Sequence, residues 1–184
     1  MAELIYPTNV TLDGFIEDPD GDINLFPVHD DVFAAHTELV RDATTFLYGR
    51  RLYEAMSVWE TDTSLAAASE AYAAFSAAWQ DAEKIVYSTS LAEPLTARTR
   101  IERRFDPAAV RALKADTEGS ILIGGADLAG QALSAGLVDE VQLYVVPVAT
   151  GGGKPGLPTG TRTELALIDQ RSFANGVVLL RYRG

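Results

Sequence analysis

The sequence contains no cysteine and only two histidines, His29 and His36. The missing thiols exclude disulfides, thiolate nucleophiles and cysteine-ligated zinc or iron–sulfur centres, and two histidines argue against a multi-histidine site, so we predict no metal site. Positive charge is also scarce, because 15 Lys and Arg stand against 26 Asp and Glu and give a formal net charge of −11. Nucleic acids and anionic membrane surfaces are therefore not expected partners.

Long apolar runs are absent as well. No stretch reaches the roughly 20 apolar residues that a membrane-spanning helix needs, and no basic start followed by an apolar segment indicates a signal peptide. We therefore expect a cytoplasmic protein. The hydrophobic share of 47% and charged share of 22% are ordinary for a globular chain. A length of 184 residues suits one core, and we expect a single domain over residues 1–184.

Short β-branched and aromatic runs alternate with helix-like segments along most of the chain. The segments expected as strands are residues 3–10, 44–48, 84–87, 99–104, 120–123, 138–148, 164–173 and 177–183. The segments expected as helices are residues 32–40, 52–58, 65–82, 107–115 and 126–135. This order predicts an α/β fold with a mixed, mostly parallel sheet, and the Asn175-Gly176 signal predicts an antiparallel C-terminal hairpin.

Two strand ends carry groups that suit phosphate. Ligands of open α/β sheets bind at the carboxyl ends of the strands. After the strand at 44–48 come Gly49, Arg50 and Arg51, and planar guanidinium groups match phosphate geometry. After the strand at 84–87 come the hydroxyls of Ser88 and Thr89. The alternatives are two solvated cations at a helix start and a simple turn or cap.

A third strand end is bare main chain. Gly124 and Gly125 follow a buried strand, and Ala126, Asp127 and Leu128 begin a helix. Glycine lets a ligand approach the backbone, and the free N–H groups of a helix start suit a pyrophosphate. The alternative is a tight strand-to-helix turn without a ligand.

The three turns together predict one dinucleotide. An adenosine 2′-phosphate would contact the arginines and hydroxyls, and a pyrophosphate would contact the double-glycine turn. Because arginine pairs favour the additional phosphate, we expect NADPH rather than NADH.

A reductase also has to deliver a proton, and three carboxylates are candidates. They are Asp13, Asp30 and Asp31, since a carboxyl group in a partly apolar cleft can have a raised pKa and act as a general acid. The alternatives are a turn at Asp13 and helix capping by the other two, with water as the proton source. We expect His36 to be packed or at the surface, and Lys154 to be solvated.

Four blocks of the sequence resemble the dihydrofolate-reductase-like superfamily. The closest branch contains the reductase domain of the bifunctional riboflavin-biosynthesis enzyme and stand-alone bacterial relatives. The matching blocks are TLDGFIEDPDG (11–21), FLYGRRLYEAM (46–56), VYSTSL (86–91) and ILIGGADLAGQALSAGLVDEVQLYVVPVATGGG (121–153). They span nearly the whole chain, and the last block is the most specific.

The resemblance implies a three-layer α/β/α fold with about eight strands and NADPH bound across the three turns. It also implies a cis peptide between Gly124 and Gly125, a loop from Asp13 to Phe26 over the nicotinamide, and a homodimer. The loop lacks the Trp of true dihydrofolate reductases and reads Ile-Asn-Leu-Phe-Pro at residues 23–27. The substrate therefore stays open among pteridine-, folate- and ribitylaminopyrimidine-like heterocycles and related carbonyls.

Three functions compete at this point. The first is an NADPH-dependent reductase of a small nitrogen heterocycle or carbonyl. The second is a non-catalytic NADP(H)-binding module that acts as a sensor or a structural homodimer. The third is a phosphate-ester enzyme, which is weaker because the P-loop signature and an acidic metal cluster are missing.

Overall fold

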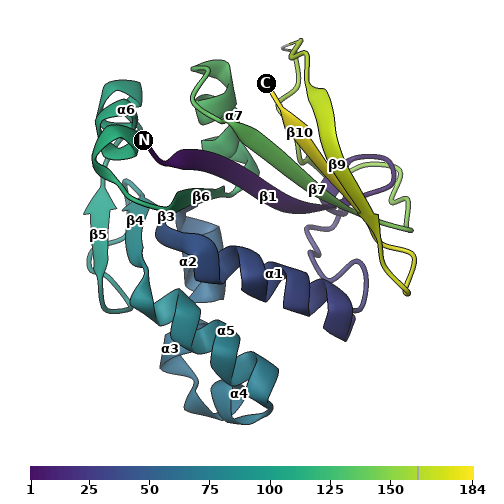
Figure 1. The fold of residues 1–184 in the computed structure, drawn as a ribbon, viewed down its shortest axis with the longest axis horizontal. Helices are drawn as coiled ribbons and strands as arrows, with labels where there is room; N and C mark the ends of the chain where they lie inside the picture. Colours follow the sequence, from purple (N-terminus) through teal and green to yellow (C-terminus); the bar gives the residue numbers. More distant parts are fainter. Residues whose placement is uncertain (161) are drawn as a thin grey trace.

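The computed structural model describes residues 1–160 and 162–184. Within them, one sheet has the strand order β5-β4-β3-β6-β1-β7-β10-β9 (Figure 1). Strand β2 pairs with β8 in a second, small sheet. The strands are β1 (Glu3–Thr11), β2 (Phe15–Glu17), β3 (Ala43–Gly49), β4 (Glu83–Tyr87), β5 (Thr99–Glu102), β6 (Ser120–Gly124), β7 (Glu140–Val146), β8 (Lys154–Pro155), β9 (Ala166–Ser172) and β10 (Val178–Arg183). The helices are α1 (Asp30–Asp42), α2 (Arg50–Met56), α3 (Val58–Thr61), α4 (Thr63–Ala67), α5 (Glu70–Asp81), α6 (Pro107–Asp116) and α7 (Ala126–Ser134).

The directions of the strands confirm a mostly parallel sheet with an antiparallel hairpin. Strands β5, β4, β3, β6, β1 and β7 run parallel to one another. Strand β10 is antiparallel to both β7 and β9. The turn between β9 and β10 uses Gly176 with a φ of 87°. None of the helices in the described part of the chain is long and apolar enough to cross a membrane.

Helices cover both faces of the sheet, as Figure 1 shows, with α6 and α7 on one side and α1 to α5 on the other. Successive residues of a strand point to opposite faces. Leu4 and Tyr6 of β1 accordingly pack with α6 and α7, whereas Ile5 packs with the opposite layer. In the same way, Leu122 of β6 faces α1 and α5, and its neighbour Ile121 faces α7. The expected three-layer arrangement is confirmed.

Most expected elements begin and end within two residues of the observed ones, but two differences from the sequence prediction are larger. The helix expected over 65–82 is interrupted, because the hydroxyl of Ser69 accepts a hydrogen bond from the backbone N–H of Tyr72 and begins α5 there. The glycine-rich segment 151–156, which lies outside every strand and helix expected from the sequence, contains β8, which pairs with β2. This second difference matters for the site, since it ties two distant loops together.

One buried ion pair fixes the antiparallel side of the sheet. The carboxylate of Glu140 in β7 is 1% exposed and accepts hydrogen bonds from Nε and Nη2 of Arg181 at 2.7 and 3.1 Å. The side-chain amide of Gln142 donates a further hydrogen bond to Glu140 at 2.6 Å. Arg181 also contacts Asp169 of β9 at 3.4 Å. A buried carboxylate with this many donors is stable only while its cation is present.

We therefore expect Arg181→Met to lower the free energy of unfolding by about 3 kcal/mol, because Glu140 would keep its burial and lose its counter-charge. Arg183→Met provides the matched control, since Arg183 pairs with Glu3 at the surface with both side chains about half exposed. That control should cost less than about 1 kcal/mol. Urea unfolding of both variants measures the difference, and equal losses would contradict the assignment.

Candidate functional site

The three turns at which we expect phosphate contacts follow β3, β4 and β6, and they lie side by side at one edge of the sheet. Strand β3 lies between β4 and β6, and its register pairs Gly49 with Tyr87 and Tyr48 with Gly124. The turns that follow these strands are therefore neighbours. A Cβ atom placed on Gly125 would lie only 3.8 Å from the backbone nitrogen of Gly49. Two glycines that are 76 positions apart in the chain thus place backbone without side chains side by side.

The two adjacent glycines serve different purposes. A Cβ on Gly124 would come within 2.4 Å of the Leu52 side chain and 3.3 Å of the Tyr48 ring, so α2 packs directly against this residue. The tight-turn interpretation therefore holds at Gly124. Gly125 has a φ of 94°, which L side chains rarely adopt, and its Cβ direction meets only the Gly49 backbone.

The expected cis peptide between Gly124 and Gly125 is wrong. No cis peptide bond occurs among residues 1–160 and 162–184. The chain instead changes direction from β6 into α7 through the positive φ of Gly125, which is the N-cap of the helix. Glycine has no side chain that could accept hydrogen bonds from the first N–H groups of α7, so these groups have no capping side chain.

The start of α2 is equally open. Gly49 is its N-cap, with φ of −72° and ψ of 157°, and offers no capping side chain. A Cβ atom added to Gly49 would meet nothing within 4 Å. The two glycine turns therefore leave space beside the main chain that a side chain would fill. Free N–H groups at a helix start are donors from which anions such as phosphate accept hydrogen bonds.

The arginine pair is at the surface of the neighbouring turn. Nη1 of Arg50 donates to the hydroxyl of Ser90 at 2.8 Å, and Nε donates to Glu54 at 2.7 Å. Arg51 is exposed beside it. The contact with Ser90 links the turn after β3 to the turn after β4. Both guanidinium groups keep donors for a ligand, since each group has five N–H bonds.

The hydroxyl groups of the β4 turn are arranged differently from the expectation. Ser88 is 8% exposed, and its hydroxyl accepts hydrogen bonds from the backbone N–H groups of Ser90 and Leu91. It therefore holds its own turn together. Thr89 is exposed. The hydroxyl that contacts an arginine is that of Ser90, the last member of this cluster, rather than that of Ser88 or Thr89.

One cationic side chain of the β4 turn, that of Arg103, was not identified from the sequence. Nη1 of Arg103 donates to the backbone carbonyls of Ser88 and Leu91 at 3.0 and 2.7 Å. It thus braces the β4 turn from the end of the edge strand β5. The available signal was the pair Arg103-Arg104 at the end of the strand expected over 99–104, in a chain with few cations.

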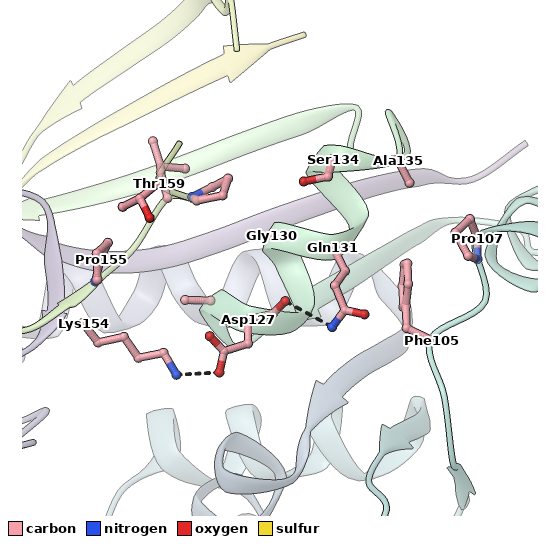
Figure 2. Close-up of a pocket in the computed structure, with 13 residues that line it drawn as sticks. Phe105, Pro107, Asp127, Gly130, Gln131, Ser134, Ala135, Lys154, Pro155 and Thr159 are labelled. Carbon is pink, nitrogen blue, oxygen red and sulfur yellow. Dashed lines mark hydrogen bonds and ion pairs between the residues drawn. The ribbon is translucent and has the colours of Figure 1, made fainter. Parts of the chain in front are cut away.

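A groove of about 620 Å³ runs along α7 from its first turn (Figure 2). Ala126 and Asp127 line it, together with Phe105 and Gln131. In Figure 2, the Gln131 amide lies toward the Phe105 ring, and its Nε2 is 3.4 Å from the Asp127 carbonyl. Leu128, in contrast, is 4% exposed and packs in the core, so only its backbone faces the helix start.

Phe105 and Gln131 were not identified as candidate site residues from the sequence. Gln131 lies one helical turn beyond Asp127 and hence on the same face of α7. Phe105 follows the edge strand and packs against Tyr87, with ring centroids 5.6 Å apart. Only the fold brings these two side chains to one wall of the groove.

We expected Lys154 to be solvated, but its side chain forms an ion pair. Its ammonium group lies 2.7 Å from the carboxylate of Asp127, with side-chain exposures of 28% and 83% (Figure 2). Both residues line the groove. The glycine-rich segment therefore places a cation at the first turn of α7.

Asp13 holds two loops together. Its carboxylate accepts a hydrogen bond from the Thr11 hydroxyl at 2.6 Å and from the backbone N–H groups of Thr150 and Gly151 at 3.2 and 2.7 Å. The Thr11 hydrogen bond is the main reason that the pKa of Asp13 lies below its ordinary value. The expected raised pKa is wrong here, because hydrogen bonds to the charged form outweigh the effect of burial.

Asp30 and Asp31 occupy the first turn of α1, where negative charge suits the helix dipole, and His29 is the N-cap. Burial alone would raise the pKa of Asp31. Hydrogen bonds from His29 at 2.7 Å and from the backbone N–H of Ala174 at 3.3 Å outweigh it, so the pKa is lowered. A raised pKa is therefore wrong for Asp31 too, and Asp30 is exposed.

His36 is packed, as expected. Its ring stacks on Tyr144 with centroids 4.0 Å apart, and burial lowers the pKa of His36 to about 4. It is therefore neutral at physiological pH. Within the described residues, no group of three or more His, Asp or Glu side chains is arranged to hold a metal ion.

Known proteins share this architecture. The uncharacterized protein YyaP of Bacillus subtilis (strain 168) is 27% identical over 191 residues, which cover 97% of this chain and 93% of YyaP. A putative riboflavin biosynthesis protein from Shewanella sp. PV-4 superposes with a TM-score of 0.76 at 17% identity, covering 100% of this chain and 98% of that one.

A longer relative has the same fold in one part. It is a diaminohydroxyphosphoribosylaminopyrimidine deaminase/5-amino-6-(5-phosphoribosylamino)uracil reductase from Thermotoga maritima. The TM-score is 0.64 at 16% identity, covering 99% of this chain and 56% of the Thermotoga chain. These likenesses confirm the dihydrofolate-reductase-like fold.

The family model named RibD C-terminal domain matches residues 2–179, nearly the full length. The parallel sheet, the double-glycine turn into α7 and this match lead to one conclusion: the chain belongs to the RibD C-terminal domain family.

Proposed function

We propose that this protein is an NADPH-dependent reductase of a small nitrogen heterocycle. The observation that carries the proposal is the meeting of two uncapped helix starts at Gly49 and Gly125, next to the Arg50–Ser90 contact. A phosphorylated dinucleotide needs such a combination of free N–H groups and fixed cations. Membership of the RibD C-terminal domain family supports a reductase.

The pyrophosphate would lie at the first turn of α7. Its oxygens would accept hydrogen bonds from backbone N–H groups of Gly125, Ala126, Asp127 and Leu128, with Gly49 on the other side. Gly124 contributes by letting α2 pack close to the turn. The partial positive charge of the helix start adds to the attraction.

The adenosine 2′-phosphate would lie at the arginine turn. Arg50 and Arg51 would donate to it, with the hydroxyl of Ser90 or exposed Thr89 as a further donor. Ser88 supports this arrangement from inside its turn. The preference for NADPH over NADH follows from these donors.

The groove along α7 suits the adenosine itself. The apolar ring of Phe105 offers a flat contact, and the amide of Gln131 offers both a donor and an acceptor. A volume of about 620 Å³ is within the range of small-molecule sites. We therefore assign the adenine to this part of the molecule.

The bound nicotinamide supplies the hydride. The protein contributes position, because hydride transfer depends on holding donor and acceptor in contact. The segment from Asp13 to Phe26 would cover the reacting atoms and exclude water. The carboxylates of Asp13 and Asp31 already accept hydrogen bonds from their own loops, which favours water as the proton source, while a direct catalytic role for Asp13, Asp30 or Asp31 stays a prediction.

The first candidate substrate is a ribitylaminopyrimidine-like compound, since the Thermotoga relative is described as a 5-amino-6-(5-phosphoribosylamino)uracil reductase. Pteridines, folates and related carbonyls are the next candidates. We further propose that residues 1–184 act as one domain, because strands from both ends of the chain share the main sheet. A homodimer stays a prediction from the family resemblance.

A second function is favoured by one observation. Each of Asp13 and Asp31 is engaged in hydrogen bonds that hold loops or a helix start, so neither is poised as an acid. A protein that binds NADP(H) without turnover would have the same contacts. A screen of NADPH oxidation with candidate substrates separates the two functions.

The cofactor preference can be tested by thermal unfolding. NADPH should raise the melting temperature more than NADH, with dissociation constants on the order of tenfold apart, since hydrogen bonds to charged groups have this strength. The double variant Arg50→Ala/Arg51→Ala should bind both cofactors equally. Arg41→Ala/Arg183→Ala removes the same charge elsewhere and should keep the preference. An equal response of the unmodified protein to both cofactors would refute the 2′-phosphate assignment.

The space between the glycine turns can be filled deliberately. Gly49 is the better target than Gly125, because its φ is ordinary and an added Cβ meets nothing within 4 Å. Gly49→Ala and Gly49→Val should lower the unfolding temperature by only a few degrees, since Gly is the better N-cap residue. The dissociation constant for NADPH should rise with side-chain size, by about tenfold or more for Val. Titration of NADPH fluorescence measures both. Unchanged affinity in Gly49→Val would remove the phosphate from this turn.

Turnover needs its own test. NADPH oxidation should be followed with ribitylaminopyrimidines, pterins, folates, flavin precursors and quinones. We expect a heterocycle to accelerate oxidation, and Gly49→Val to abolish that acceleration. If NADPH binds and no compound is reduced, the non-catalytic function is the correct one.

A further inference from the structure

The contact between Lys154 and Asp127 raises an electrostatic problem at the proposed phosphate site. The carboxylate of Asp127 lies in the first turn of α7, where it suits the helix dipole. The same carboxylate would repel an incoming pyrophosphate. Lys154, 2.7 Å away, neutralises that charge and lies on the wall of the same groove.

The backbone around Lys154 is firmly held. A Cβ on Gly153 would come within 1.8 Å of the Glu17 carbonyl oxygen, so β8 is packed backbone to backbone against the segment after β2. Lys154 pairs with Glu17 across the small sheet, and the Asp13 carboxylate holds the N–H of Gly151. The backbone that carries the Lys154 side chain is thus held by β2 and by Asp13.

The ion pair between Lys154 and Asp127 contributes little to the stability of the fold. Asp127 is 83% exposed, and ion pairs between exposed side chains contribute little to stability. Lys154 is 28% exposed and directed to the helix start in Figure 2. A lysine ammonium has three donors, so it can bind Asp127 and a phosphate oxygen together.

We propose that Lys154 is a pyrophosphate-binding residue. Asp127 holds its ammonium group at the start of α7, and the β2–β8 sheet positions its backbone. When a 5′-phosphate reaches the first turn of α7, the ammonium group donates to it and cancels the repulsion from Asp127. Strand β2, which pairs with β8, is thereby coupled to whether a phosphate occupies the start of α7. This inference rests on the proposed function.

The test uses four probes and the full chain. NADPH, NADH and 2′,5′-ADP each carry a phosphate at the 5′ position, whereas 2′-AMP does not. Dissociation constants by isothermal titration, or by competition where binding is weak, should be measured for Lys154→Met, Lys154→Arg and Asp127→Asn.

Lys154→Met should weaken NADPH, NADH and 2′,5′-ADP by a similar factor, on the order of tenfold, and leave 2′-AMP unchanged. Lys154→Arg should restore most of the affinity. Asp127→Asn should tighten NADPH, because it removes the repulsive charge and frees the ammonium group. Arg50→Ala/Arg51→Ala should give the opposite pattern, weakening 2′-AMP and sparing NADH.

The outcomes separate this inference from the proposed function. If the unmodified protein binds NADPH and Lys154→Met binds it equally well, the role of Lys154 is refuted and the reductase proposal stands. If Lys154→Met weakens 2′-AMP as much as 2′,5′-ADP, the lysine acts only on the fold, which also refutes the inference. If the unmodified protein binds neither NADPH nor NADH, the proposed function and the role of Lys154 are both refuted.

Discussion

The approach of two bare backbones, at Gly49 and Gly125, is the constraint on which the site depends. Parallel pairing of β3 with β6 brings their carboxyl ends to one level, and each strand then continues into a helix. Neither helix has a capping side chain at its start. Two sets of free N–H groups therefore border one space, and the packing of Leu52 on Gly124 keeps the helices close enough for this to happen.

Charge is distributed unevenly around this space. The chain carries a formal net charge of −11, yet Arg50, Arg51, Arg103 and Lys154 belong to the turns and strands that meet here. Local cations in an acidic protein concentrate an anionic ligand at one place and repel it elsewhere. The Asp13 carboxylate and the β2–β8 sheet join the loop after β1 to the loop after β7, so that cation placement and loop position are coupled.

Much of the fold was predictable because its signals are local. The apolar runs at Ser120–Gly124 and Glu83–Tyr87, the Pro107 helix start with its Asp106 cap and the Asn175-Gly176 hairpin all depend on neighbouring residues. The site was predictable only in part. Which glycine faces Leu52, which serine contacts Arg50, and that Lys154 reaches Asp127 depend on residues distant in sequence. The pKa of Asp13 likewise depends on N–H groups near residue 150.

The most direct measurement is an X-ray structure of crystals grown with excess NADPH. The pyrophosphate should lie between the starts of α2 and α7, within hydrogen-bond distance of the N–H groups after Gly125. The 2′-phosphate should lie beside Arg50 and the adenine beside Phe105 and Gln131. A dinucleotide bound elsewhere, or a protein without bound cofactor whose glycine turns are covered by side chains, would contradict the account and leave only the fold.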